Sequence, residues 1–180
     1  ISYCSHPENI KYLEKNSNFT FEFCNITNEK AVQNTIMKFK PHIVLNFAAE
    51  SHVDNSILSP MEFIKTNVLG LSNLLNSTKT LWDQNINKNV DNLFIQISTD
   101  EVFGSLKDNE PAFIEENRYK PNSPYSASKA SGDMLCRAYN KTYRMPIIVT
   151  NCSNNFGPRQ FPEKLIPNTI RNAIKGNDIQ

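Results

Sequence analysis

The sequence is short of cysteine, histidine and net charge, and these shortages exclude several classes of function. Its four cysteines form no C-x-x-C pair and its three histidines show no metal-ligand spacing, so we predict no metal site. The formal net charge of +1 gives no electrostatic reason to expect nucleic acid or an anionic membrane surface as a partner. No apolar run reaches transmembrane length, and the first residues do not resemble a signal peptide. We therefore expect a cytoplasmic protein with reduced, mostly buried thiols.

Glycine is scarce as well. The chain has five glycines in 180 residues, and nowhere do they form the pattern G-x-G-x-x-G. A turn of that kind presents backbone N–H groups to a phosphate at a helix N-terminus. We therefore expect no segment of this chain to hold a pyrophosphate in that way.

The chain does contain an alternation of two patterns. Apolar or aromatic runs of strand length stand at residues 19–24, 42–48, 92–98 and 146–151, and stretches of helical periodicity stand at 29–40, 60–84, 124–143 and 163–175. Repeated strand–helix units predict a parallel sheet with helices on both faces. The expected fold class is α/β with a doubly wound parallel sheet.

A sheet of this type usually begins with a strand, a glycine-rich turn and a helix. The residues ahead of the predicted strand at 19–24 leave room for a loop and a short helix, but not for a first βαβ unit. The last five residues fall in a predicted loop. We therefore expect an internal fragment that lacks the first βαβ unit of its fold.

Two short motifs carry chemistry. Tyr125 and Lys129 stand at i and i+4 on one predicted helix, so they lie on the same face, one turn apart. An ammonium beside a phenol favours the phenolate, and a group with a pKa of about 10 in water would then become a base near neutral pH. Thr99, Asp100 and Glu101 directly follow a predicted strand and add a second acid/base pair, which simple hydride transfer does not need. Together the motifs predict redox chemistry coupled to the loss of water.

Four segments resemble a known family, in its order and spacing. They are residues 47–54 (FAAESHVD), 97–104 (ISTDEVFG), 121–131 (PNSPYSASKAS) and 149–167 (VTNCSNNFGPRQFPEKLIP). The sequence is similar to the extended short-chain dehydrogenase/reductase superfamily. Within it, the chain most resembles the nucleotide-sugar 4,6-dehydratases that act on dTDP-glucose.

The resemblance implies a Rossmann-type fold with NAD as cofactor. Residues 1–151 would be a partial NAD-binding domain with the catalytic residues, and 152–180 the start of a substrate-binding region whose larger part is missing. It also implies a homodimer, formed through the predicted helices at 60–84 and 124–143.

The resemblance also implies a role for each motif residue. Tyr125 would deprotonate the sugar 4-hydroxyl as hydride passes to NAD, and Lys129 would depress the pKa of Tyr125 and bind the nicotinamide ribose. Thr99 would hydrogen-bond the sugar 4-oxygen. Glu101 would remove the C5 proton, and Asp100 would protonate the departing 6-hydroxyl. The two adjacent carboxyls would need different protonation states, which unequal environments provide.

Other residues match binding positions of the family. At the cofactor the resemblance places Asn25, Ile26, Ala48, Ala49, Glu50, Ser51, His52, Thr66 and Asn155, besides Tyr125 and Lys129. At the substrate it places His52, Thr99, Asn154, Lys164 and Leu165, where the Lys164 ammonium would suit a pyrophosphate.

Two positions depart from the family pattern. Asn25 stands where the family usually has an Asp that accepts a hydrogen bond from the adenine amino group, and an amide oxygen accepts without charge assistance. Asn55 stands where the bacterial dTDP-glucose enzymes commonly carry Arg, and His-Val-Asp-Asn also resembles the UDP-glucose 4,6-dehydratases.

Alternative functions therefore stay open. UDP-glucose is the nearest rival substrate. An epimerase or decarboxylase of the same fold would need Tyr125 and Lys129 but generally lacks the Asp at position 100. A non-catalytic dinucleotide-binding regulator would tend to lose the tyrosine, the lysine or the acidic pair, and all are present here.

Overall fold

The structure is a computed structural model that describes residues 5–84 and 91–178. The chain divides into two compact units, one formed by Cys24–Ser153 and the other by Ile1–Phe23 with Asn154–Gln180. The predicted division, at residues 151 and 152, assigns a function to each part and stays a prediction. Among the described helices, none has the length and apolarity needed to cross a membrane.

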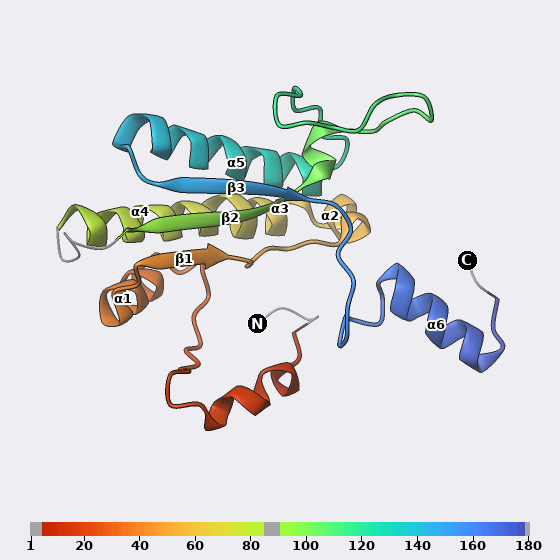
Figure 1. Ribbon diagram of the computed structural model, residues 1–180, viewed down its shortest axis with the longest axis horizontal. Coiled ribbons are helices and arrows are strands. Elements are labelled where there is room, and N and C mark those ends of the chain that lie inside the picture. Colours follow the sequence, from red (N-terminus) through yellow and green to blue (C-terminus); the bar gives the residue numbers. More distant parts are fainter. Residues whose placement is uncertain (1–4, 85–90, 179–180) are drawn as a thin grey trace. The chain divides into compact units, whose positions relative to one another are not determined.

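The larger unit is built on a parallel sheet. Its strands β1 (Ile43–Asn46), β2 (Leu93–Thr99) and β3 (Ile147–Cys152) lie in the order β1-β2-β3, so β2 is central (Figure 1). Both strand pairs are parallel. The predicted α/β fold class and three of the four predicted strands are thereby confirmed, although β1 is shorter than residues 42–48.

The fourth predicted strand, at residues 19–24, is wrong. Its aromatic residues favour an extended backbone, but a strand also needs a hydrogen-bonded neighbour. Within residues 5–84 and 91–178, no strand pairs with this segment. Phe21 and Phe23 are accordingly exposed, at 54% and 70% of their surface.

Clear local signals begin and end the helices that flank the sheet. Asn28 caps helix α1 (Glu29–Phe39) by accepting from the Ala31 N–H at 3.0 Å, and Lys40 ends it in the left-handed conformation. Helix α5 (Pro124–Tyr143) has the predicted bounds. Helix α6 (Leu165–Lys175) belongs to the other unit, which also holds two 3₁₀ helices, Pro7–Asn9 and Lys11–Lys15.

The long helix predicted at 60–84 is one helical run with an irregular middle. It consists of α3 (Pro60–Phe63), a π-helical segment (Ile64–Gly70) and α4 (Leu71–Asp83). A short helix that the sequence did not predict, α2 (Val53–Leu58), precedes it. No pattern in the sequence indicated the π-helical segment, and π-helical turns are frequent at functional sites.

The core lies between the sheet and a layer formed by α1, α4 and α5. Leu71, Leu75 and Phe94 are fully buried there, and each such side chain contributes about 1.5–3 kcal/mol. Of the described cysteines, Cys136 is buried in this core while Cys24 and Cys152 are half-buried, and all three are free thiols. The prediction of mostly buried thiols holds for Cys136 alone, and Cys4 lies outside the described residues.

Alternate residues of a strand point to opposite faces of the sheet. On the face opposite the core, Ile43, Leu45 and Ile148 are exposed at 55%, 52% and 48%. The larger unit therefore leaves part of one sheet face open, and the helices predicted on both faces are described there on one face only.

Candidate active site

The carboxyl ends of parallel strands share one edge of the sheet, where ligands bind in folds of this kind. Directly after β2, Thr99 caps a 3₁₀ turn, Asp100–Phe103, by accepting a hydrogen bond from the Glu101 N–H at 3.2 Å. The Thr99 hydroxyl also donates to the Asp100 carboxylate at 3.3 Å. The turn thus holds the predicted Thr-Asp-Glu motif at this edge.

Helix α5 brings Tyr125 to the same motif. Ser123 and Ser126 form a reciprocal capping box, and Pro124 occupies the first turn, so the helix start is firmly set. Tyr125 follows at once, 9% exposed, with a side-chain hydrogen bond to Thr99 and its ring edge against Phe63. Two predicted catalytic residues from different elements therefore meet.

The surroundings of Tyr125 oppose its ionisation. Burial raises the pKa of Tyr125 to about 12, and the negative charges of Glu101, Asp100 and Asp133 act in the same direction. The hydrogen bond from Thr99 lowers that pKa by a smaller amount. The expected lowering of the Tyr125 pKa is therefore wrong in direction for this structure, because burial and nearby carboxylates outweigh everything that favours the phenolate.

Lys129 is buried one turn further along α5, with 5% of its surface exposed. Its ammonium donates a hydrogen bond of 2.6 Å to the carbonyl oxygen of Ile97 in β2. Burial lowers the pKa of Lys129, and the carboxylate of Asp133 opposes that shift. The predicted Tyr-Lys pair therefore sits on the inner face of α5, packed against the central strand.

The sequence prediction missed Asp133, which stands one further turn along α5 and is 2% exposed. Its Oδ2 accepts hydrogen bonds from Ser98 at 2.6 Å and from the Tyr119 hydroxyl at 3.1 Å. Its Oδ1 is buried with no hydrogen-bond partner. Asp133 follows Lys129 by four residues, as Lys129 follows Tyr125, and this repeated spacing could have placed Asp133 on the same helix face.

Asn67, in the π-helical segment, is a second residue that the prediction missed. Its side chain accepts from the Glu50 N–H at 2.9 Å and donates to the Glu50 carbonyl at 2.9 Å. It also donates to Ser128 Oγ at 2.8 Å, beside Lys129 on α5. Asn67 therefore fixes the loop after β1 relative to α5, and nothing in its sequence neighbourhood indicated this.

The loop after β1 carries five of the predicted cofactor residues: Ala48, Ala49, Glu50, Ser51 and His52. The Ala48 N–H donates to the Asn46 side chain at 3.1 Å, and Ser51 is exposed. His52 is the N-cap residue directly before α2, and its Nδ1 is buried without a partner. Thr66, half-buried, precedes Asn67 in the π-helical segment.

Asn25 and Ile26 lie near the start of the larger unit. The Asn25 side-chain oxygen accepts from both the N–H and the hydroxyl of Thr27, each at 3.0 Å. An amide oxygen has two lone pairs, so the predicted bond from adenine would have to replace one of these. The Ile26 carbonyl accepts from Asn73 at 2.9 Å, which holds this segment against α4.

The remaining predicted residues belong to the other unit: Asn154, Asn155, Lys164 and Leu165. Gln160 donates to the Asn155 carbonyl at 3.0 Å, beside a hollow of about 460 Å³ in that unit. Lys164 is the residue before α6, and Leu165 is 72% exposed.

The larger unit thus combines a buried phenol, a buried ammonium and two carboxyl groups at one sheet edge. Such a set can take a proton from a hydroxyl, take one from carbon and give one to a leaving group. In the part of the chain that the structure describes, no three His, Cys, Asp or Glu side chains are grouped to hold a metal ion.

One protein-family model matches almost the whole chain. The family model described as "GDP-mannose 4,6 dehydratase" matches residues 2–180. Among curated proteins, a dTDP-glucose 4,6-dehydratase of Neisseria gonorrhoeae is 43% identical over 180 residues, which is 99% of this chain and 52% of that protein. The chain therefore spans about half the length of the curated relatives it matches.

Solved structures agree with the family match. A dTDP-glucose 4,6-dehydratase from Bacillus anthracis in complex with NAD superposes with a TM-score of 0.85 at 39% identity, covering 99% of this chain and 52% of that one. A dTDP-glucose 4,6-dehydratase from Streptomyces venezuelae with NAD and TYD bound gives a TM-score of 0.87 at 34% identity, covering 98% and 51%.

Proposed function

This chain belongs to the family described as GDP-mannose 4,6 dehydratase, and from that premise we propose that it carries the catalytic residues of an NAD-dependent dTDP-glucose 4,6-dehydratase. The reaction converts dTDP-glucose into dTDP-4-keto-6-deoxyglucose and water, which makes the enzyme a hydro-lyase. The meeting of Tyr125 with the Thr99–Glu101 turn at the ligand-binding edge carries the proposal.

The residues present fit NAD. The Lys129 ammonium has three N–H donors, of which Ile97 takes one, so it can also bind a ribose hydroxyl. The Nδ1 atom of His52 has no hydrogen-bond partner and can bind a polar group at the same edge of the sheet. Asn67 holds the backbone at Glu50 in place there. Bound NAD supplies the hydride acceptor for C4 and the hydride donor for C6.

Tyr125 takes the proton of the sugar 4-hydroxyl. In the structure its phenol is protonated at neutral pH, because its pKa lies at about 12. A positive charge near the phenol, whether from Lys129 or from an oxidised nicotinamide, lowers that pKa. The base is therefore activated when the cofactor and substrate are in place, and Thr99 stabilises the phenolate when its single hydroxyl proton points to Tyr125 and not to Asp100.

The acidic pair completes the loss of water. The 4-ketone makes the C5 proton acidic, and Glu101 removes it. Asp100 gives a proton to the departing 6-hydroxyl, so that water leaves and a C5–C6 double bond forms. Hydride return to C6 and proton return to C5 then yield the product, which differs from the substrate by one water.

The function is tested on the full-length protein with dTDP-glucose and, separately, UDP-glucose. Formation of the alkali-labile 4-keto-6-deoxy product from dTDP-glucose supports the proposal. Preference for UDP-glucose would move the assignment to the second candidate, which Asn55 on α2 favours. No product from either sugar would contradict both.

Asp100→Asn separates the two halves of the reaction. An amide is neutral and cannot protonate the leaving hydroxyl, so we expect elimination to slow by about 10²–10⁴-fold while the first hydride transfer is spared. Rapid-mixing measurement of reduced nicotinamide absorbance follows hydride transfer, and product analysis follows elimination. Equal loss of both steps would contradict the role of Asp100.

The proposal extends to a cytoplasmic homodimer. Apolar side chains are exposed on both predicted interface helices: Met61, Ile64 and Leu69 on the run from Pro60 to Gly70, and Met134 and Tyr143 on α5. Free thiols at Cys24, Cys136 and Cys152 suit a reducing compartment. Sedimentation of the full-length protein tests the dimer.

A further inference from the structure

Asp133 is a buried acid that the mechanism above does not use. Its carboxylate joins three parts of the larger unit: α5, on which it lies, the end of β2 through Ser98, and the loop before α5 through Tyr119. Ser98 immediately precedes Thr99. The same carboxylate therefore touches the strand end that carries the catalytic turn.

We propose that Asp133 is a positioning residue whose buried negative charge keeps Lys129 protonated, so that Lys129 can assist Tyr125 in the first hydride transfer. The inference rests on the proposed function. It names a residue outside the matched motifs and assigns it a role through Lys129, not a contact with substrate or cofactor.

The electrostatics of the pair support a charge role. Burial disfavours both charged forms: it lowers the pKa of Lys129 and raises that of Asp133, and each group opposes the shift of the other. A buried charge that loses its compensating partner is strongly destabilised. Without Asp133, Lys129 would therefore lose its proton at lower pH.

Other groups around the pair do not replace that charge. Lys129 is near Cys136 on α5 and Cys152 on β3, and burial raises the Cys136 pKa to about 12, so this thiol is neutral. Asp133 faces Ser98 on β2, Asn151 on β3 and Tyr119 on the loop, which are neutral hydrogen-bonding groups at neutral pH. The carboxylates of Glu101 and Asp100 act on the Tyr125 pKa and are not among the charges that shift the Lys129 pKa.

The hydrogen bonds of Asp133 alone do not explain a carboxylate at this position. Ser98 and Tyr119 both donate to Oδ2, and an asparagine oxygen would accept the same two bonds. The Asn151 amide also faces the carboxylate, but Oδ1 is buried without a hydrogen bond of ordinary geometry, which is costly unless a nearby positive charge compensates it. Lys129 supplies that charge.

Asp133→Asn tests the proposal in the full-length holoenzyme, because it keeps the shape and removes the charge. We expect the alkaline limb of the pH–rate profile of the first hydride transfer to move to lower pH by about one unit. The acid limb, which reports ionisation of Tyr125, should also move to lower pH, but by less. Among the causes named for the raised Tyr125 pKa, the charge of Asp133 contributes least. An alkaline limb at the wild-type position would overturn the proposal.

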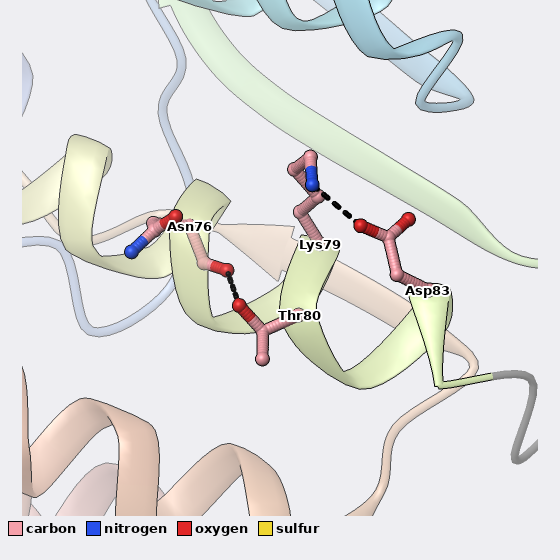
Figure 2. Close-up of polar contacts among 4 residues, drawn as sticks. All are labelled: Asn76, Lys79, Thr80 and Asp83. Atoms are coloured by element: carbon pink, nitrogen blue, oxygen red, sulfur yellow. Dashed lines mark hydrogen bonds and ion pairs between the residues drawn. The ribbon is translucent and has the colours of Figure 1, made fainter.

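Three variants serve as controls. Asp133→Glu keeps the charge and should restore the wild-type limb. Ser98→Ala removes a hydrogen bond to Asp133 but leaves Asp133 ionised at alkaline pH, so the alkaline limb should stay at its wild-type position. A shift as large as that of Asp133→Asn would mean that the effect comes from packing and not from charge. Asp83→Asn makes the same chemical change at an exposed carboxylate that pairs with Lys79 at the end of α4 (Figure 2), and it should leave the profile unmoved.

A second measurement needs no variant that might unfold. Carbon NMR of the Asp133 carboxyl in the wild-type holoenzyme should give an ionised group near neutral pH, and a neutral carboxyl there would overturn the proposal. Failure of the proposed function is distinguishable, because the wild-type protein would then form no product from dTDP-glucose.

Discussion

At the scale of single residues, the sequence pattern predicts where a side chain lies, whereas its surroundings in the fold determine its pKa. The helical spacing of Tyr125 and Lys129 was enough to predict that they share one face of α5, whereas only the family resemblance implied that Tyr125 and Thr99 act at one site. The direction of the Tyr125 pKa was not predictable, because it depends on burial and on the facing carboxylates. Asp133 and Asn67 were missed for the same reason: a polar residue inside a helix pattern does not reveal what it packs against.

Replacement of Tyr125 by phenylalanine isolates the hydroxyl. The ring can keep its edge-to-face contact with Phe63, so we expect the fold to persist. The base is lost, and the first hydride transfer should fall by about 10²–10⁴-fold. Single-turnover kinetics of the full-length protein measure this step, with thermal unfolding as the control for folding. Near-normal hydride transfer would show that another group is the base.

At the scale of elements, prediction succeeded where the signals are local. Pro124 with its serine caps sets the start of α5, and Asn28 and Pro41 bracket α1. It failed where an element depends on distant partners. The π-helical segment Ile64–Gly70 places Asn67 against Glu50 and Ser128, which are far away in sequence. The segment at residues 19–24 has strand-like residues but no strand beside it among the described residues.

Gly132 tests the close packing of α5 on α4. A Cβ at this position would lie 2.9 Å from Leu71 Cδ2 and 3.3 Å from the Asn67 carbonyl oxygen. Alanine gains about 1 kcal/mol of helix propensity, but overpacking costs about 1–3 kcal/mol, so Gly132→Ala should be destabilising by about 1 kcal/mol. Leu71 is fully buried and the carbonyl is backbone, so neither can easily yield.

Urea denaturation measures the loss. Gly157→Ala is the matched control, because a Cβ there meets nothing within 4 Å. A Gly132→Ala protein as stable as the wild type would mean that the two helices can separate at little cost.

At the scale of the whole molecule, the chain corresponds to part of the fold of its relatives. It spans about half the length of its curated relatives, and one face of its sheet leaves Ile43, Leu45 and Ile148 exposed. The fold class followed from the strand–helix alternation, because that pattern extends over the whole sequence. The division into two units did not, because it joins residues from both ends of the chain.

The 180-residue chain alone should bind NAD weakly. It contains no G-x-G-x-x-G turn, and so lacks the row of backbone N–H groups that such a turn offers to the pyrophosphate. Titration calorimetry of this chain, with the full-length protein as the reference, measures the difference. Tight binding by the chain alone would mean that other groups hold the pyrophosphate.

The alkylation of Cys136 can report the opening of the packing around α5. Its thiol has no exposed surface, and burial, with the charge of Asp133, raises the thiol pKa to about 12. Alkylating reagents attack the thiolate, so the folded form should be inert towards them. Modification of Cys136 then requires that the packing of α5 against the sheet and α4 has opened. The alkylation rate of Cys136, measured separately from that of the other cysteines, would time the opening of the helix that carries Tyr125.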